Sequence, residues 1–255
     1  MDRAARAGFV ARGVIYLLVG LLALQVAFQD TGNQADRGGA LRQLSGQPFG
    51  AFLLWALGAG LAGMAVWRLS EAWFGASGPG GHKAPTRALS AARSAFYAFV
   101  AYSVLRFAAG DGSSGSSDRR SQDVTAQALG LPGGRWIVGV AAAGVVGAGV
   151  WIAVRAARRT YHEDLRWGAM TRNARRLVDG TGVPGGIARG VVFATAGVFA
   201  FQAARDFDPD EAKGMDDTLR TFADSPAGPW LLAAIALGLA LFGAFSFAVA
   251  RWRRT

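Results

Sequence analysis

The sequence contains no cysteine, which excludes disulfide bonds, thiolate nucleophiles and cysteine-ligated metal sites. It has only two histidines, His82 and His162, and neither has a second ligand at a spacing typical of metal sites. No spacing of serine, histidine and aspartate indicates a catalytic triad, and the glycine-rich stretches lack the Lys-Ser/Thr of a phosphate loop. We therefore expect no metal, no cofactor and no catalytic residue.

Charge and lysine are also scarce. Only 17% of the residues are charged, whereas an average soluble domain has about 25%. Of the 27 basic residues only Lys83 and Lys213 are lysines, and this excess of arginine, with abundant Ala and Gly, is typical of a GC-rich bacterial genome. The charges gather between long apolar stretches, which is typical of a multi-pass membrane protein.

Six apolar stretches are long enough to cross a bilayer, because a helix needs about 20 residues to span about 30 Å of hydrocarbon. With no water in that layer, each must be a helix that satisfies its own backbone. The sequence therefore predicts an all-α integral membrane protein, with residues 1–255 forming one membrane domain. The expected spans are 8–28, 50–69, 89–109, 135–154, 187–204 and 229–250.

The basic residues also predict the orientation of these spans. Eighteen lie on the side of the two termini, in the N-terminal segment, the 68–93 and 155–189 connections and the C-terminus, and nine lie on the other side. By the positive-inside rule both termini are cytoplasmic, in a bacterial plasma membrane. The first span resembles a signal peptide but is expected to be retained, because the same pattern recurs twice internally. The net charge of +10 is thus explained without nucleic acid.

A similar sequence pattern recurs three times along the chain. Residues 11–13, 92–94 and 188–190 each read Ala-Arg-Gly or Ala-Arg-Ser, and four residues after each arginine stand Tyr16, Tyr97 and Phe193. The repeat units are 3–75, 85–160 and 175–255, each a pair of spans. Because each unit has an even number of spans, the three copies run parallel in the membrane, and a pseudo-threefold axis is the simplest closure.

The second span of each repeat begins with a Pro-x-Gly-x-aromatic motif. A proline fits the first helical turn, and the glycine permits a close approach there. Ahead of it, segments 38–47 and 214–225 are expected to form short amphipathic helices on the outer surface, and the serine-rich stretch 110–121 is expected to be a loop. The Gly-rich stretches 78–81 and 182–186 are interpreted as turns. The motif residues are Pro48, Gly50, Pro132, Gly134, Pro226 and Gly228.

These residues resemble an uncharacterised bacterial membrane family, domain of unknown function 1206, in which a transmembrane pair occurs three times. The first copy carries the resemblance in "ARGVIYLLVGLLAL", "GALRQLSGQPFG" and "LGAGLAGMAVWRLSEA". The third copy follows well, whereas the second departs with Ser94 for glycine and "ALGLPGG" for "LSGQPFG". The resemblance covers nearly all the chain except 156–180, and it implies no activity.

Arg12, Arg93 and Arg189 lie about one turn inside the three odd-numbered spans. One interpretation is that they fix the topology, since an arginine near a helix end reaches the interface at low cost. The other is a ring that binds a lipid headgroup or another anion. The seven arginines of residues 155–176 leave the same two interpretations open. Either they fix the topology, or they bind an acidic lipid or an acidic partner.

Two further sets recur at equivalent positions. Gln25, Arg106 and Gln202 are either interfacial hydrogen-bonding residues or an outer polar ring on a permeation path. Gly60, Gly144 and Gly238 are interpreted as small residues for close helix packing, with a lining role as the alternative. Arg68 and Glu71 are expected to pair at i, i+3.

We expect a non-enzymatic membrane protein with a structural, lipid-binding or partner-binding role, whose partners are membrane lipids, including anionic ones, or an unknown protein. The alternative is a small-solute or ion transporter with a central site at the repeat axis. Three two-helix repeats also build the mitochondrial carriers, but the carrier Pro-x-[Asp/Glu]-x-x-[Lys/Arg] pattern is absent from these spans and no carboxylate lies in mid-span.

Overall fold

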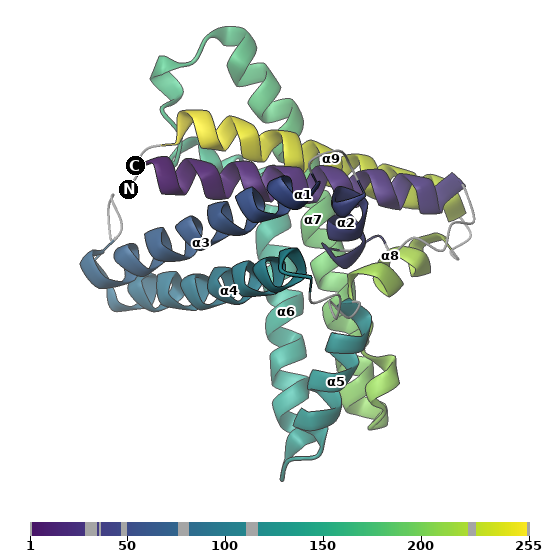
Figure 1. The fold of residues 1–255 in the computed structure, drawn as a ribbon. Coiled ribbons are helices and arrows are strands. Elements are labelled where there is room, and N and C mark those ends of the chain that lie inside the picture. The colour runs from purple at the N-terminus through teal and green to yellow at the C-terminus, as the bar shows by residue number, and fades with distance from the viewer. Residues whose placement is uncertain are drawn as a thin grey trace.

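The computed structural model describes residues 2–28, 35, 37–46, 50–75, 82–110, 117–223 and 228–253. They form α-helices and short 3₁₀ turns, with no strand beyond one isolated bridge between Leu165 and Arg253. Six helices are long and apolar enough to cross a membrane, which confirms the predicted all-α class and the number of spans (Figure 1). These are α1 (Asp2–Phe28), α3 (Gly50–Phe74), α4 (Ala84–Ala108), α6 (Gly134–Ala157), α7 (Arg172–Asp206) and α9 (Gly228–Trp252).

In each repeat one short helix precedes the second long helix. These short helices are α2 (Arg37–Ser45), α5 (Ser117–Leu129) and α8 (Met215–Ala223). The first and last match the expected amphipathic segments, and Leu41 and Leu219 are buried in them. α5 was not expected from the serine-rich stretch, of which residues 111–116 lie outside the described part of the chain.

The predicted boundaries fail most clearly at α7. The helix begins at Arg172 and has 35 residues, so it runs through the stretch 182–186 that the sequence suggested was a turn. Pro184 lies inside it and leaves the carbonyl of Gly180 without its helical partner. Gly185 packs closely on α9 and Gly186 on α6, since a Cβ at Gly185 would overlap Phe242 and one at Gly186 would overlap Ala156. Tertiary packing therefore keeps this segment helical. The stretch 78–81 lies outside the described residues.

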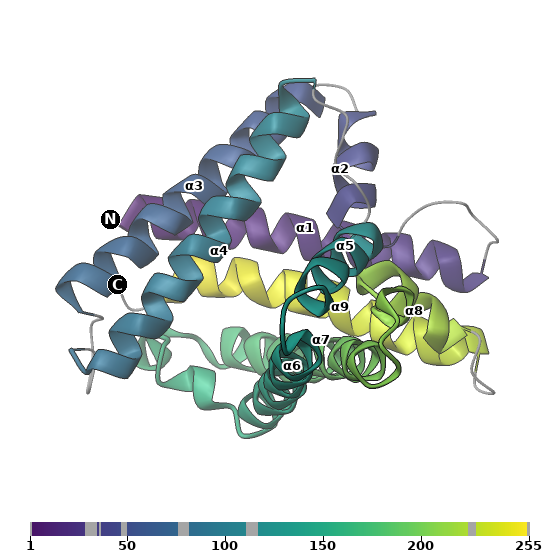
Figure 2. The same cartoon turned by 90° about the horizontal axis from the view of Figure 1, so that it is seen from below.

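The long helices form three pairs, α1 with α9, α3 with α4, and α6 with α7. Each pair joins the first helix of one repeat to the second helix of another. In Figure 1 the three pairs lie closest together toward the end of the bundle that carries the two termini and spread apart at the opposite end, with α6 and α7 running steeply across α1 and α9. Figure 2 looks nearly along α6 and α7. The short helices lie toward the diverging end.

The three pairs use equivalent residues. A Cβ at Gly13 would lie 3.0 Å from the carbonyl oxygen of Gly243, and one at Gly190 would lie 2.6 Å from that of Gly149. In the third pair, Ser94 Oγ donates a hydrogen bond to Ala65 O at 2.8 Å. These partners occupy corresponding repeat positions, so the register of the three pairs is the same. Only α3–α4 carries side chains where the other pairs place glycine against glycine.

Contacts within the repeats do not follow the same rule. In repeat 1 a Cβ at Gly60 would lie 3.3 Å from the Cβ of Ala11, and in repeat 3 one at Gly238 would overlap the Cβ of Ala188. In repeat 2 a Cβ at Gly144 would meet nothing within 4 Å. Among the described residues α4 and α6 share no interface comparable to α1–α3 or α7–α9. Helices α1, α3, α4, α6, α7 and α9 therefore follow one another around an incomplete ring, and full threefold closure is absent from this part of the chain.

The motif that starts each second helix has a clear steric role. A Cβ at Gly50 or Gly134 would collide with the last carbonyl oxygens of the preceding short helix, so each glycine lets that helix turn directly into the next. Pro132 lies in the turn before α6, whereas Pro48 and Pro226 lie outside the described residues, and Gly228 begins α9 with φ +44°. The motif aromatics are highly exposed, as residues at a membrane interface are. They are Phe52, Trp136 and Trp230, with exposures of 71%, 78% and 76%.

Candidate functional site

The structure brings Arg12 of α1 and Arg189 of α7 into one cluster near the convergent end of the bundle. Both guanidinium groups lie against the ring of Phe242, at 5.1 and 5.0 Å from its centroid. Arg93, the equivalent residue of repeat 2, does not join them and is exposed. The helix that carries Arg93, α4, nevertheless contributes Tyr97, which interacts electrostatically with both Arg12 and Arg189.

Arg12 is held by aromatic rings and by the hydroxyl groups of Ser246 and Tyr97. Its Nε donates to Ser246 Oγ at 3.1 Å, and its guanidinium carbon lies 4.8 Å from the centroid of Phe9. Ser246 is fully buried and donates onward to the carbonyl oxygen of Phe242 at 2.9 Å. These contacts orient the guanidinium group without neutralising its charge, since none of its partners is a carboxylate.

Arg189 has even fewer polar partners. Its guanidinium carbon lies 5.2 Å from the centroid of Phe193 and 5.7 Å from that of Tyr16. Its Nε is buried and has no hydrogen-bond partner. A buried donor left unpaired costs free energy on the order of 1–3 kcal/mol, so this nitrogen is a vacant donor inside the cluster.

An alternating series of arginines and aromatic rings connects this pair to the end of the bundle that carries the termini. Arg253 lies 5.1 Å from the ring of Phe9 and 4.9 Å from that of Trp67, and Arg68 lies 4.3 Å from the ring of Trp67. We call Arg68, Trp67, Arg253, Phe9, Arg12, Phe242 and Arg189 the arginine–aromatic ladder. The sequence repeats point to Arg12 and Arg189 only, and the rings between the arginines were not foreseen.

Among the described residues, a carboxylate pairs with the ladder only at Arg68, at the end nearest the termini. Arg68 Nη1 lies 2.6 Å from Glu71 Oε2, which confirms the expected local pair. Burial, and next the charge of Arg68, lower the pKa of Arg253 to about 10. Among the described residues no carboxylate pairs with Arg12 or Arg189, so the inner end has two positive charges that only rings and hydroxyl groups surround. Two guanidinium groups in this setting are suited to hold a phosphate, carboxylate or sulfate group through charge-assisted hydrogen bonds.

The proposed outer ring of polar residues is not assembled. The ends of α1, α4 and α7 that carry Gln25, Arg106 and Gln202 lie far apart in both views (Figures 1 and 2). Gln25 and Gln202 are half-buried on separate helices, and Arg106 is exposed near the ring of Tyr102 at 5.8 Å. A constriction built from these three residues is therefore absent from this conformation.

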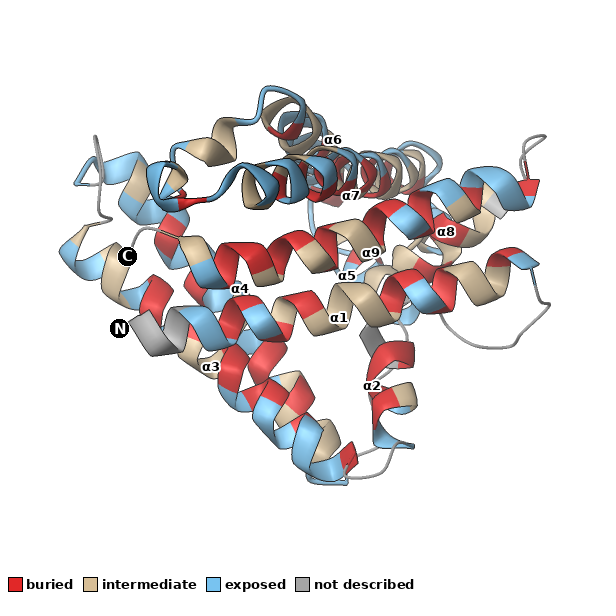
Figure 3. Cartoon of the chain, turned by 90° about the horizontal axis from the view of Figure 1, so that it is seen from above, coloured by how far each residue is buried: buried red, intermediate tan, exposed pale blue. Residues whose placement is uncertain are grey.

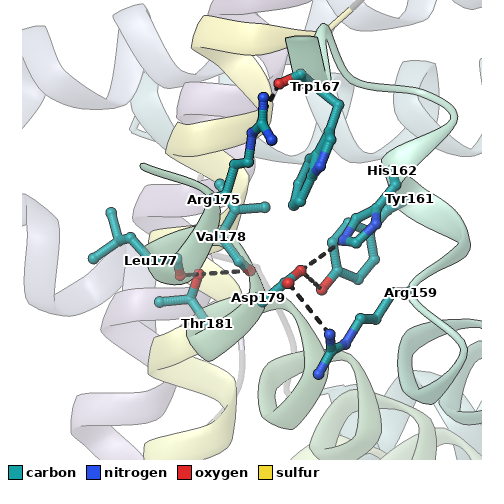
Figure 4. Close-up of polar contacts among 9 residues, drawn as sticks. All are labelled: Arg159, Tyr161, His162, Trp167, Arg175, Leu177, Val178, Asp179 and Thr181. Carbon is teal, nitrogen blue, oxygen red and sulfur yellow. Dashed lines mark hydrogen bonds and ion pairs between the residues drawn. The ribbon is translucent and has the colours of Figure 1, made fainter. Parts of the chain in front are cut away.

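A second polar cluster fixes the connection between repeats 2 and 3 (Figure 4). Asp179 Oδ1 accepts from Tyr161 Oη at 2.9 Å and lies 2.7 Å from His162 Nε2, while Arg159 Nη1 lies 3.5 Å from Oδ2. His162 also stacks on Trp167, with ring centroids 3.7 Å apart. Burial, and then the hydrogen bond to Asp179, raise the pKa of Tyr161 above its usual range. The described residues contain no group of three or more His, Asp or Glu that could hold a metal ion here or elsewhere.

Comparison with known proteins agrees with the repeat architecture. The pattern of the Domain of Unknown Function (DUF1206) matches three segments, residues 7–75, 89–159 and 185–253. An uncharacterized protein, YxxB of Bacillus subtilis (strain 168), is 32% identical over 251 residues, which cover 96% of this chain and 89% of that protein. No protein of known structure matches. The three matched segments each contain one helix pair, and the chain therefore belongs to the DUF1206 family.

Proposed function

We propose that this membrane protein is a binding protein for a phosphate-bearing anion, which it holds between Arg12 and Arg189 near the cytoplasmic face of a bacterial plasma membrane. The observation that carries the proposal is the uncompensated pair itself: two guanidinium groups share the ring of Phe242, and no described carboxylate neutralises either. The buried, unpaired Nε of Arg189 supplies a donor for the anion.

The cost of leaving the pair empty supports a ligand. The positive charges of Arg12 and Arg189 repel each other, and no described carboxylate offsets that repulsion. Contact with aromatic rings returns roughly 0.5–2 kcal/mol for each cation. A bound anion reverses the sign of the balance, because it attracts both groups at once. If the arginines served only to fix the topology, they would be expected to reach the interface separately.

A transporter of a small anion is the second candidate, and the arginine–aromatic ladder favours it. The ladder extends from the inner pair to Arg68 and Arg253 at the end that carries the termini. It offers a series of cationic positions to a soluble anion. The two candidates share the same site and differ in whether the phosphate belongs to a lipid or to a dissolved ion.

The test is binding to the purified protein in nanodiscs of neutral lipid. One arm adds phosphatidylglycerol and measures bound lipid by native mass spectrometry, and the other titrates inorganic phosphate by calorimetry. Arg12→Gln and Arg189→Gln are each expected to weaken binding at least tenfold in the arm where binding occurs, because each removes charge-assisted hydrogen bonds worth about 1.5–3 kcal/mol.

The control is Arg205→Gln, which makes the same charge change on α7 at a side chain that is 75% exposed. It is expected to leave binding unchanged. Binding of lipid alone supports the lipid-binding role, and uptake of phosphate into liposomes supports transport. Equal binding by wild type and both arginine variants would overturn the proposal.

A further inference from the structure

The open side of the helix ring lies between α4 and α6, and the sequence repeats show which residues are unpaired there. In repeats 1 and 3, Gly60 packs on Ala11 and Gly238 packs on Ala188. The corresponding residues of repeat 2 are Gly144 of α6 and Ala92 of α4, and both are exposed. The interface is therefore formed twice and missing once.

The same contrast extends along the two helices. Gly8 and Met64 are buried where α1 meets α3, and Gly185 and Phe242 are buried where α7 meets α9. Their counterparts in repeat 2 are Leu89 of α4, which is 50% exposed, and Ala148 of α6, which is also exposed. Of the six candidate spans α6 is the least buried and α9 the most buried, and Figure 3 shows the many buried residues along α1 and α9. We call these exposed faces of α4 and α6 the α4–α6 seam, defined by Leu89, Ala92, Phe96, Val140, Gly144 and Ala148.

The α4–α6 seam is apolar and borders the arginine pair. Phe96 and Val140 are 61% and 72% exposed. The next residue along α4 after Phe96 is Tyr97, which interacts with Arg12 and Arg189. On the other side α6 packs against α7, the helix that carries Arg189. A ligand in the seam therefore has hydrocarbon-compatible walls and a cationic end.

We propose that the α4–α6 seam holds the acyl chains of an anionic phospholipid whose phosphate lies on Arg12 and Arg189. This inference rests on the proposed anion site and names its ligand. Both helices of the seam are candidate membrane spans, so the medium that faces it is lipid hydrocarbon. A diacyl lipid contacts the seam and the charges together, whereas a soluble anion contacts the charges alone. Packing of Ala92 on Gly144, as in the other two repeats, excludes the lipid.

The absence of cysteine permits a direct test by cross-linking in nanodiscs. Ala11→Cys with Gly60→Cys places the pair in a formed interface, where the Cβ atoms lie 3.3 Å apart, close to the separation in disulfides. Ala92→Cys with Gly144→Cys places the equivalent pair across the seam. Both are made in the whole protein and oxidised in neutral lipid and in phosphatidylglycerol.

We expect the repeat 1 pair to cross-link fully in both lipids, and the seam pair to cross-link in neutral lipid but at least tenfold more slowly in phosphatidylglycerol. Once formed, the seam disulfide is expected to lower phosphatidylglycerol binding at least tenfold, and reduction to restore it. Gly144→Leu, which fills the seam without a disulfide, is expected to lower lipid binding by a similar factor.

The outcomes separate this inference from the proposed function. If the locked protein binds phosphatidylglycerol normally and Arg12→Gln still weakens that binding, the anion site stands and the seam is refuted. Binding of inorganic phosphate without binding of phosphatidylglycerol likewise refutes the seam alone. If neither probe binds in an Arg12-dependent manner, both proposals fall.

Discussion

Adding one methyl group at each of three equivalent glycines tests whether the ring of helices is open between α4 and α6. Gly60, Gly144 and Gly238 occupy the same place in the three repeats but have different surroundings. A Cβ at Gly238 overlaps Ala188, one at Gly60 lies 3.0 Å from the carbonyl oxygen of Ala7, and one at Gly144 lies in open space. Substitution by alanine should therefore give three different stabilities.

The expected magnitudes follow from two terms. Alanine is favoured over glycine in a helix by about 1 kcal/mol, and this gain is common to all three variants. Overpacking a close interface costs roughly 1–3 kcal/mol, and only the packed positions incur it. The difference between Gly238→Ala and Gly144→Ala therefore isolates the steric cost. Gly144→Ala should be as stable as wild type or up to about 1 kcal/mol more stable, and Gly60→Ala should lie between the other two.

Thermal unfolding in detergent, followed by tryptophan fluorescence, measures the difference. For a chain of this size roughly 1–3 kcal/mol corresponds to a Tm difference of about 2–12 °C. If Gly144→Ala lowers the Tm as much as Gly238→Ala does, α6 is packed at this position and the reasoning about the seam is wrong. If neither variant changes the Tm, the contacts at Gly238 do not limit stability.

Two further predictions concern the connection 158–171. Asp179→Asn should expose the connection, because the Asp179 carboxylate holds Tyr161, His162 and Arg159. Trypsin is therefore expected to cleave after the arginines of the connection at least several-fold faster than in wild type. An unchanged cleavage rate would show that the cluster does not hold the connection. Tyr161 should ionise at a higher pH than ordinary tyrosines, because burial and the hydrogen bond to Asp179 favour its neutral form and raise its pKa. Its contribution to the free energy of unfolding should be complete below about pH 10 and be lost as the pH rises through the pKa of the folded state. The difference in tyrosinate absorbance between wild type and Tyr161→Phe measures this pKa, and a titration at the ordinary value would contradict the prediction.

Hydropathy and repeat spacing predict the six long helices and the short helices α2 and α8, but not α5 or the pairing of the long helices. The spans follow from length and composition, and the repeats place Gly13, Ser94 and Gly190 at equivalent contacts, as the structure shows. The start of α7 could not be predicted in this way. Its first residues are polar, and Pro184 normally ends a helix. The close contact of Gly185 with α9 overrides that preference, and such a contact depends on tertiary structure.

The candidate site was predictable only in part, because equivalent residues do not guarantee equivalent contacts. The repeat identifies Arg12, Arg93 and Arg189, but whether they meet depends on the packing of α4 against α6. The role of Phe242 was also hidden, since its counterparts in the other repeats are Met64 and Ala148. A shared aromatic ring between two arginines is therefore a property of one repeat interface, which the triplicated pattern does not reveal.

The missing interface and the charge of the site are physically connected. With Arg93 outside, Arg12 and Arg189 form one repelling pair at their end of the ladder, and closure with Arg93 beside them would add two more such pairs. This added repulsion opposes closure, because no described carboxylate offsets it. A compact anion at the axis would attract all three arginines and favour closure, whereas a phospholipid keeps α4 and α6 apart with its chains. Inorganic phosphate should therefore accelerate cross-linking of Ala92→Cys with Gly144→Cys, and phosphatidylglycerol should slow it. Opposite effects of two ligands with the same phosphate chemistry would distinguish a lipid site from a simple anion site.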